Sequence, residues 1–196
     1  LATALSRLFP AGTTRVIEGD DYHLYERGAH EWGTLTHLNP FANDLASLRD
    51  DVRKARIRET VRSRHYDHDS GRFLKSREIV AGDLVVINGL HALYIDKEHD
   101  VYDVGVFLRM EDSLREDLKV KRDSSNRGAT ERQVRESIER RRPDSERYIS
   151  PQADVADLII ELGEDLLAKR RAGRLICTVR SRGMTFPHRL SNAMNS

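Results

Sequence analysis

A continuous apolar run at residues 84–87 (LVVI) is the feature that most restricts how this chain can fold. Four consecutive apolar residues indicate a strand covered on both faces, as in the interior of a parallel sheet. The run is followed by Asn88, and a second short predicted strand, residues 15–18, ends in Gly19-Asp20-Asp21. Open α/β sheets bind their ligands at the carboxyl ends of strands. We therefore expect a site where these two strands end.

The remaining segments continue the same pattern of short strands and helices. Further strands are predicted over residues 101–108, 158–162 and 175–179, with helical stretches between several of them. This βαβ rhythm predicts a doubly wound α/β fold with a mostly parallel sheet. Two helices are expected to begin at capping boxes, residues 113–116 (SLRE) and 130–133 (TERQ), and the second to stop before Pro143. Residues 64–73 (RHYDHDSGRF) predict a hairpin or lid, because β-forming residues flank an Asp-Ser-Gly turn.

Composition limits the class of protein. The chain has 196 residues, and we expect a single domain over residues 1–190. Its 33 basic and 32 acidic side chains leave a net charge of +1, which does not favour nucleic acid as a partner. The single cysteine, Cys177, excludes an intrachain disulfide, and no run approaches the roughly 20 apolar residues of a membrane helix. We expect a soluble cytoplasmic protein with no membrane partner.

A first group of polar residues follows the predicted strand at 15–18. It reads DDYHLYER from Asp20 to Arg27, and it brings together a carboxylate, an imidazole and a guanidinium. Phosphoryl transfer needs a carboxylate that orients the attacking hydroxyl and accepts its proton. Asp20 is the candidate general base. The alternative is that Asp20 or Asp21 only caps the next turn.

A second group lies within residues 119–128. Lys119, Arg122 and Asp123 have the i, i+3, i+4 spacing that places them on one face of a helix. Converging cations of this kind suit phosphate groups, because Arg and Lys offer several charged donors. The alternative is an exposed, salt-bridged helix face, which has the same sequence pattern.

Two further patterns do not indicate sites of their own. His65 and His68 have a spacing that would suit a metal pair on a helix, but a hairpin does not bring i and i+3 to one side. Three arginines at 140–142 lie where a helix is expected to end, and cations complement the backbone dipole there. We expect neither a metal pair nor a nucleic-acid interface from them.

Taken in chain order, these segments resemble the phosphoribulokinase and uridine kinase family of P-loop kinases over about residues 1–162. The phosphoribulokinase branch is the more similar, because its characteristic runs correspond to several segments of this chain. These are 19–27 (GDDYHLYER), 38–43 (LNPFAN), 66–71 (YDHDSG), 89–91 (GLH), 119–128 (KVKRDSSNRG), 142–144 (RPD) and 148–152 (YISPQ). Each is weak alone, and together they are specific. The resemblance implies a fold of the P-loop-containing nucleoside triphosphate hydrolase type.

The same resemblance implies a kinase that uses ATP and Mg²⁺ to phosphorylate a hydroxyl of a small sugar or sugar phosphate. It assigns Asp20 as the general base and Asp123 as a second acid near the metal and the substrate. Lys119 and Arg122 would neutralise charge on the transferred phosphoryl group. The expected substrate-binding residues are Tyr22, His23, Arg27, His68 and Arg127.

Two features depart from the family pattern. Asn88 stands where the family has an acidic residue that organises Mg²⁺, and an amide is a poorer ligand for this ion, so Asn88 is a weak metal candidate. The glycine-rich phosphate loop and the N-terminal strand before it, expected ahead of a helix over residues 1–9, are missing from the given sequence. Residues 191–196 (SNAMNS) look like tag-derived leader residues, and we expect an omitted segment rather than a protein without the loop.

Two other functions stay open at the level of sequence. A uridine or cytidine kinase would share the fold, but an uncharged nucleoside does not need the anion contacts expected of Arg27 and His68. A non-catalytic regulatory module that binds phosphate ligands would be consistent with Asn88 in place of an acid. The sequence leaves the identity of the acceptor and the presence of a homo-oligomer undetermined.

Overall fold

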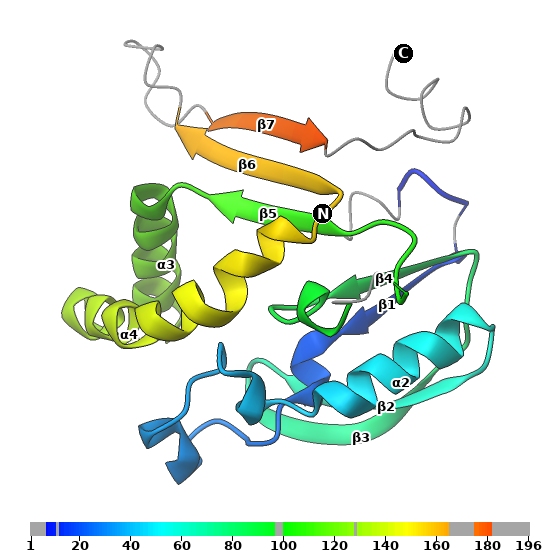
Figure 1. Cartoon of the computed structure of the whole chain (residues 1–196). Coiled ribbons are helices and arrows are strands. Elements are labelled where there is room, and N and C mark those ends of the chain that lie inside the picture. The colour runs from blue at the N-terminus through cyan, green and yellow to red at the C-terminus, as the bar shows by residue number, and fades with distance from the viewer. Residues whose placement is uncertain (1–6, 11, 97–99, 128, 165–174, 182–196) are drawn as a thin grey trace. The chain divides into compact units, whose positions relative to one another are not determined.

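The computed structural model describes residues 7–10, 12–96, 100–127, 129–164 and 175–181, which form two compact units (Figure 1). The first unit comprises the described residues up to Tyr102 together with Arg140–Gln152, and the second comprises Asp103–Glu139 together with the described residues from Ala153 onward. The tag-like segment 191–196 and most of the helix predicted over 1–9 lie outside the described residues. Residues 7–9 form a turn and a bend. The prediction of a single domain stays a prediction.

The first unit contains the two strands predicted to carry a site. β1 (Thr14–Glu18) pairs in parallel with β4 (Leu84–Asn88), so that Glu18 lies opposite Asn88 at the carboxyl ends. A glycine follows each strand, and a Cβ placed on Gly89 would lie 2.9 Å from the Cα of Gly19. The two backbones therefore approach more closely than residues with a Cβ atom at these two positions would permit. The loops that follow the two strands therefore meet at the strand ends, and the presence of a ligand site there stays a prediction.

A helix and a hairpin complete the core of the first unit. α2 (Leu45–Arg56) begins at Asp44, whose side chain accepts from the Ser47 N–H at 3.1 Å. Its apolar face recurs at i, i+4 and i+7 and packs on β1 and on the hairpin of β2 (Val61–Asp67) and β3 (Arg72–Ile79). The buried residues are Ile17, Tyr22, Leu48, Val52, Ala55, Val61, Ile79, Ile95 and Val101. The predicted hairpin is confirmed and is longer than residues 64–73.

Short helical turns connect these elements. They are η1 (Gly19–Tyr22), η2 (His30–Gly33), η3 (Pro40–Ala42) and η4 (Leu93–Ile95). The strand predicted over residues 101–108 is wrong in its first half. Val101 is buried in the core of the first unit, where its N–H donates to the Asp96 carboxylate at 2.8 Å. The strand begins only at Val106, because the preceding residues serve another core.

The second unit is built on a three-stranded sheet. β5 (Val106–Met110) pairs in parallel with β6 (Leu158–Glu164), which pairs antiparallel with β7 (Leu175–Ser181). α3 (Asp112–Arg127) begins one residue before Ser113, so the capping box predicted at 113–116 is displaced. The box before α4 (Glu131–Asp144) is confirmed, since the Thr130 N–H donates to Gln133 Oε1 at 2.9 Å and the Gln133 N–H donates back to Thr130 Oγ1 at 3.3 Å.

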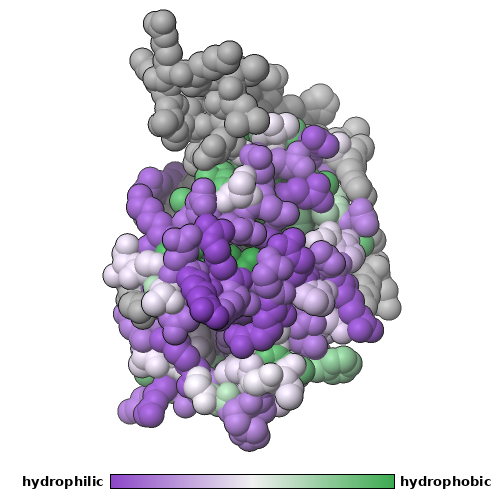
Figure 2. All heavy atoms as spheres, turned by 90° about the vertical axis from the view of Figure 1, so that its left-hand side faces the viewer, coloured by the Kyte–Doolittle hydropathy of each residue, from purple (hydrophilic) through white to green (hydrophobic). Residues whose placement is uncertain are grey.

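α4 does not stop before Pro143 as predicted. Proline removes one N–H donor and its ring crowds the carbonyl four residues earlier, but its fixed φ is compatible with a helix. Pro143 lies one residue before the end of α4, and the chain continues into a π-helical turn (Ser145–Ile149) and a 3₁₀ turn (Ser150–Asp154). Figure 2 shows that the side of the molecule bearing α3 and α4 is predominantly hydrophilic. Charged pairs one turn apart, such as Arg132 with Glu136 at 2.8 Å, line this surface. Within the described residues, no helix is long and apolar enough to cross a membrane.

Candidate active site

Asp20 lies at the carboxyl end of β1, in the first turn of η1. Its Oδ1 is 3.4 Å from His23 Nε2, and its Oδ2 is 3.4 Å from His68 Nε2. About a third of the Asp20 side chain is exposed (34%). No side chain caps η1, and α2 is capped by Asp44, so the capping alternative for Asp20 and Asp21 is not realised. The carboxylate is therefore open to a ligand from solvent, and it lies beside one buried imidazole, that of His23, and one largely exposed imidazole, that of His68.

His23, predicted to contact the substrate, is buried beneath this carboxylate. Its Nδ1 lies 2.6 Å from Asn43 Oδ1, and its Nε2 faces Asp20. The ring also packs edge-on against Trp32 and Tyr66, with centroids 6.2 and 5.4 Å away. Both ring nitrogens are thus directed at protein atoms.

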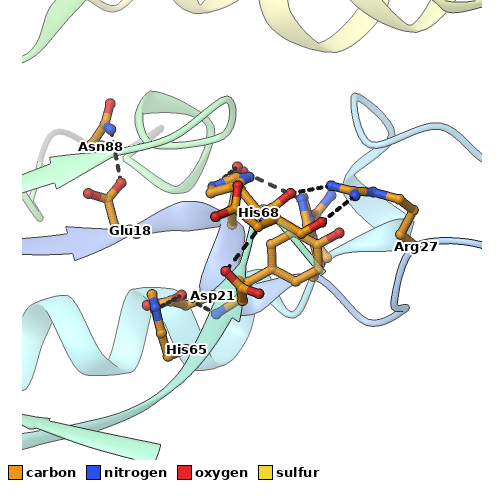
Figure 3. A network of polar contacts seen from close by, with 12 residues as sticks. Glu18, Asp21, Arg27, His65, His68 and Asn88 are labelled. Carbon is orange, nitrogen blue, oxygen red and sulfur yellow. Dashed lines mark hydrogen bonds and ion pairs between the residues drawn. The ribbon is translucent and has the colours of Figure 1, made fainter. Parts of the chain in front are cut away.

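Arg27 and His68 meet at the turn of the β2–β3 hairpin (Figure 3). The Arg27 guanidinium donates to the backbone carbonyls of His68 and Asp69, at 2.5 and 3.1 Å. Gly71 closes the turn at φ 72°, and a Cβ there would lie 2.4 Å from the Arg27 Cβ. The Arg27 hydrogen bonds therefore stabilise the turn that carries His68. The His68 imidazole is largely exposed and lies next to Asp20.

Asp21 faces away from Asp20, into the hairpin. Its carboxylate is buried, accepts from Arg77 Nη2 and from the Tyr66 N–H, both at 2.7 Å, and lies 3.5 Å from His65 Nδ1. His65 and His68 thus turn to different carboxylates, and no group of three possible metal ligands occurs among the described residues. The Asp21 carboxylate therefore connects η1 to the hairpin, and its role is structural.

Tyr22 does not have the place predicted for a substrate-binding residue. It is 4% exposed within the core of the first unit, and its hydroxyl donates to Asp51 Oδ2 at 2.9 Å. Burial raises the pKa of this phenol above its ordinary value. The side chain points inward because three consecutive residues of a tight helical turn face different directions, and Tyr22 occupies the apolar one.

Two polar residues end the paired strands. Asn88 Nδ2 donates to Glu18 Oε2 at 2.9 Å (Figure 3). A carboxylate and an amide thus meet at the last residue pair of strands β1 and β4. A small cavity of about 10 Å³ has Asp20, His23, Asn43 and His91 in its lining. Asp20 and His91 come shortly after the two strands in the sequence. Asn43 was not predicted as a site residue, although it ends the run LNPFAN; only its contact with His23 reveals it.

His91 provides a pH-dependent prediction. Its ring is buried, with Nε2 3.0 Å from the Leu38 carbonyl, and burial lowers the pKa of the imidazole below its ordinary value of 6.5. Below pH 6.5 the unfolded chain therefore binds a proton that the folded chain does not. The free energy of unfolding is expected to fall as the pH drops below that value, and His91→Gln should flatten this decline in urea titrations. An unchanged slope in the variant would contradict the assignment.

The second predicted cluster lies in the second unit, on α3. Arg122 Nε donates to Asp123 Oδ1 at 2.8 Å; the Asp123 side chain is nearly buried, whereas about half of Arg122 is exposed. Lys119 lies one turn earlier, as its spacing predicts. Arg127 is the last residue of α3, and its side chain and Gly128 lie outside the described part of the chain. The helix confirms the shared face of the cluster, and its phosphate contacts stay predictions.

Comparisons with known proteins agree with these features. The profile of the Phosphoribulokinase / Uridine kinase family matches residues 11–168. The phosphoribulokinase of Synechocystis sp. is 29% identical over 172 residues, 88% of this chain and 52% of that protein. The chloroplastic phosphoribulokinase of Spinacia oleracea is 32% identical over 150 residues, 76% of this chain and 37% of that protein. The chain spans about half or less of the length of these curated relatives.

Solved structures share the fold. Phosphoribulokinase from Rhodobacter spheroides superposes with a TM-score of 0.72 at 20% identity, over 98% of this chain and 78% of that one. A putative fructose transport system kinase from a Silicibacter species gives 0.57 at 17% identity, over 79% and 75% of the two chains. The predicted α/β fold of the P-loop kinase type is confirmed. Since the family profile covers most of its length, the chain belongs to the phosphoribulokinase and uridine kinase family.

Proposed function

We propose that the protein is an ATP-dependent kinase that transfers the γ-phosphoryl group to a hydroxyl of a small sugar phosphate, with ribulose 5-phosphate as the first candidate acceptor. The observation that carries the proposal is the Asp20 carboxylate, open to solvent at the carboxyl end of β1 and flanked by two imidazoles. The names of the curated relatives support the acceptor class. A cytoplasmic location is part of the proposal.

Asp20 orients the attacking hydroxyl and accepts its proton, while His68, on the hairpin turn, contacts the acceptor. Lys119 and Arg122 stabilise charge on the phosphoryl oxygens, and Arg127 binds the acceptor phosphate. Asp123 holds the Arg122 guanidinium through the 2.8 Å bond and keeps its fork in one orientation. Catalysis in this scheme consists of orientation and electrostatic stabilisation.

Mg²⁺ would supply charge neutralisation between the phosphate groups of ATP. The ion favours hard oxygen ligands and keeps several waters, so a full protein cage is not required. The Glu18 carboxylate at the paired strand ends would be one ligand of such a shell. Asn88 would be a weaker one, because its Nδ2 donates to Glu18 at 2.9 Å and its amide oxygen is turned away from that carboxylate. Asp123 is a further acidic candidate for the metal site.

The test is a screen of ATP consumption by the full-length protein, with Mg²⁺ and with one acceptor in each assay. Ribulose 5-phosphate is compared with free pentoses, glycerate, uridine and cytidine. Turnover is expected with the sugar phosphate and to depend on added Mg²⁺. Turnover with only uridine or cytidine would replace the proposal by a nucleoside kinase. Acceptor binding by calorimetry without any turnover would favour a regulatory module.

A further inference from the structure

We propose that Asp144, the last residue of α4, positions the acceptor side of the candidate site through Thr36. Both are positioning residues in this proposal, because they act through His23 and do not contact the substrate. The inference rests on the proposed function, since it concerns the histidine that the family resemblance assigns to acceptor binding. It also gives a role to the runs LNPFAN (38–43) and RPD (142–144), which the proposed mechanism does not use.

The Thr36 hydroxyl joins two parts of the first unit that are 108 positions apart in the chain. It donates to Asp144 Oδ2 at 2.7 Å and accepts from the Leu38 N–H at 3.1 Å. A carboxylate accepts hydrogen bonds, so the hydroxyl hydrogen is directed at Asp144 and an oxygen lone pair at Leu38. The second bond is the local turn that threonine hydroxyls form with the backbone two residues later. One hydroxyl therefore shapes this turn and connects it to α4.

Segment 36–39 (THLN) lies in a turn, and side chains hold its backbone in place. Three consecutive carbonyls of the segment face side-chain nitrogens. These contacts are Asn43 Nδ2 to the carbonyls of His37 and Asn39, at 3.3 and 2.9 Å, and His91 Nε2 to that of Leu38, at 3.0 Å. The position of the segment therefore depends on side-chain contacts, among which the Thr36–Asp144 bond holds its first residue.

Segment 36–39 supports the His23 ring. The His37 ring lies against it, with centroids 5.0 Å apart and planes tilted by 40°. Asn43, whose NH₂ group faces the segment, has its amide oxygen 2.6 Å from His23 Nδ1. On its other side the ring lies 3.4 Å from Asp20, between Nε2 and Oδ1. A shift of the segment therefore moves the ring, and a misplacement of about 1 Å can cost a hundredfold in rate.

Asp144 is suited to be the fixed partner of this bond, because the chain that follows it is well packed. Gln152 is 5% exposed, and its Nε2 donates to the carbonyls of Leu90 and Tyr148, at 2.8 and 2.9 Å. The Tyr148 ring packs edge-on against Tyr94, with centroids 6.4 Å apart. The bond from Thr36 therefore connects the turn to a packed part of the first unit.

The first test uses fluorescence and needs no turnover. Trp32 packs on His37, with ring centroids 4.0 Å apart, so its emission reports on segment 36–39. The Trp32 signal of each full-length variant is the difference from the same variant with Trp32→Phe. Thr36→Val is expected to make Trp32 more accessible to quenching by acrylamide. Thr36→Ser keeps the hydroxyl and should match the unsubstituted protein, and equal quenching in all three proteins would overturn the proposal.

The second test is a comparison of KM values. Thr36→Val is expected to raise KM for the acceptor by about 5- to 10-fold with KM for ATP within about twofold, and Thr36→Ser should restore it. The matched control is Thr34→Val, because the Thr34 hydroxyl donates to the Glu31 carbonyl at 3.2 Å and not to α4. The control should leave both KM values within about twofold. An equal rise in acceptor KM for Thr34→Val, or no rise for Thr36→Val, would refute the positioning role.

A double-mutant cycle shows whether Thr36 and Asp144 act as one unit. Asp144→Leu should repeat the rise in acceptor KM, whereas Asp144→Asn keeps an oxygen that accepts from the hydroxyl and should show little change. Thr36→Val combined with Asp144→Leu should show no further rise, because both substitutions break the same bond. Effects that multiply in the combined variant would exclude the proposal, since the two residues would then act separately.

These tests separate the inference from the proposed kinase activity. If the unsubstituted protein consumes no ATP with any acceptor, the kinase proposal fails, and the fluorescence still decides whether Thr36 positions the segment. If the kinase is active and Thr36→Val changes neither Trp32 quenching nor the acceptor KM, the positioning role fails alone.

Discussion

Asp20→Asn is expected to lower kcat at least about a hundredfold while leaving the fold and acceptor binding nearly unchanged. The amide has the shape of the carboxylate but cannot accept the proton of the attacking hydroxyl, and a positioned base contributes about 10²- to 10⁴-fold. The exposed side of Asp20 is solvated, and its contacts to His23 and His68 are 3.4 Å long, so their loss should cost little stability. Steady-state kinetics with the best acceptor, together with thermal melting, measure both effects.

A matched control is Asp50→Asn on the exposed face of α2, which removes one carboxylate at a distance in the chain from the site. It should change kcat by less than about twofold, as expected for a surface substitution. If Asp20→Asn retains near-normal turnover, Asp20 is not the base, and the carboxylate of Glu18 becomes the alternative to examine.

The strands and the hairpin were predictable because their patterns are local. A continuous apolar run, a glycine at each strand end and an Asp-Ser-Gly turn each restrict the backbone within a few residues. The capping box at Thr130 was predictable for the same reason, since both partners lie in one turn. Val101 was assigned to a strand because apolar sequence does not show which core a residue enters, and here it completes the core beside Asp96.

The candidate site was only partly predictable, because direction depends on tertiary packing. Asp20, Asp21 and Tyr22 are consecutive and polar or amphipathic, yet one faces solvent, one the hairpin and one the core. No sequence pattern separates these three directions. Asn43 was missed since its importance comes from a partner 20 positions away. Asp20 was predicted from its place after a strand, and the likeness to a family agreed with it, whereas the burial of Tyr22 argues against the substrate contact predicted for that residue.

Several contacts fix the loops and turns that surround Asp20, the candidate base. The close approach of Gly19 and Gly89 brings the loops after β1 and β4 together. Arg27 fastens the turn carrying His68, and Arg64 Nη2 donates to the His23 carbonyl at 2.8 Å. Asp21 completes this frame, because it is the buried link between η1 and both strands of the hairpin. The position of Asp20 therefore depends on a neighbour that has no contact with substrate in the proposed mechanism.

Asp21→Ala is accordingly expected to lower the free energy of unfolding by about 3 kcal/mol. The substitution leaves the Tyr66 N–H buried without its acceptor and removes the charge-assisted bond from Arg77. Arg77 is 38% exposed and can be solvated by water after the substitution. The expected loss in the free energy of unfolding is therefore below the largest values for broken buried ion pairs. Urea denaturation monitored by circular dichroism measures the change, provided that both proteins unfold in one cooperative step.

The same hairpin contains the control for this prediction. Arg62 and Glu78 form a cross-strand ion pair with both side chains mostly exposed, so Glu78→Ala should cost less than about 1 kcal/mol. A loss for Asp21→Ala no larger than for Glu78→Ala would show that Asp21 is not the link inferred here. If the link is real, Asp21→Ala should also lower kcat, because a hairpin released from η1 no longer presents His68 to Asp20. Glu78→Ala leaves that link in place and should leave kcat unchanged.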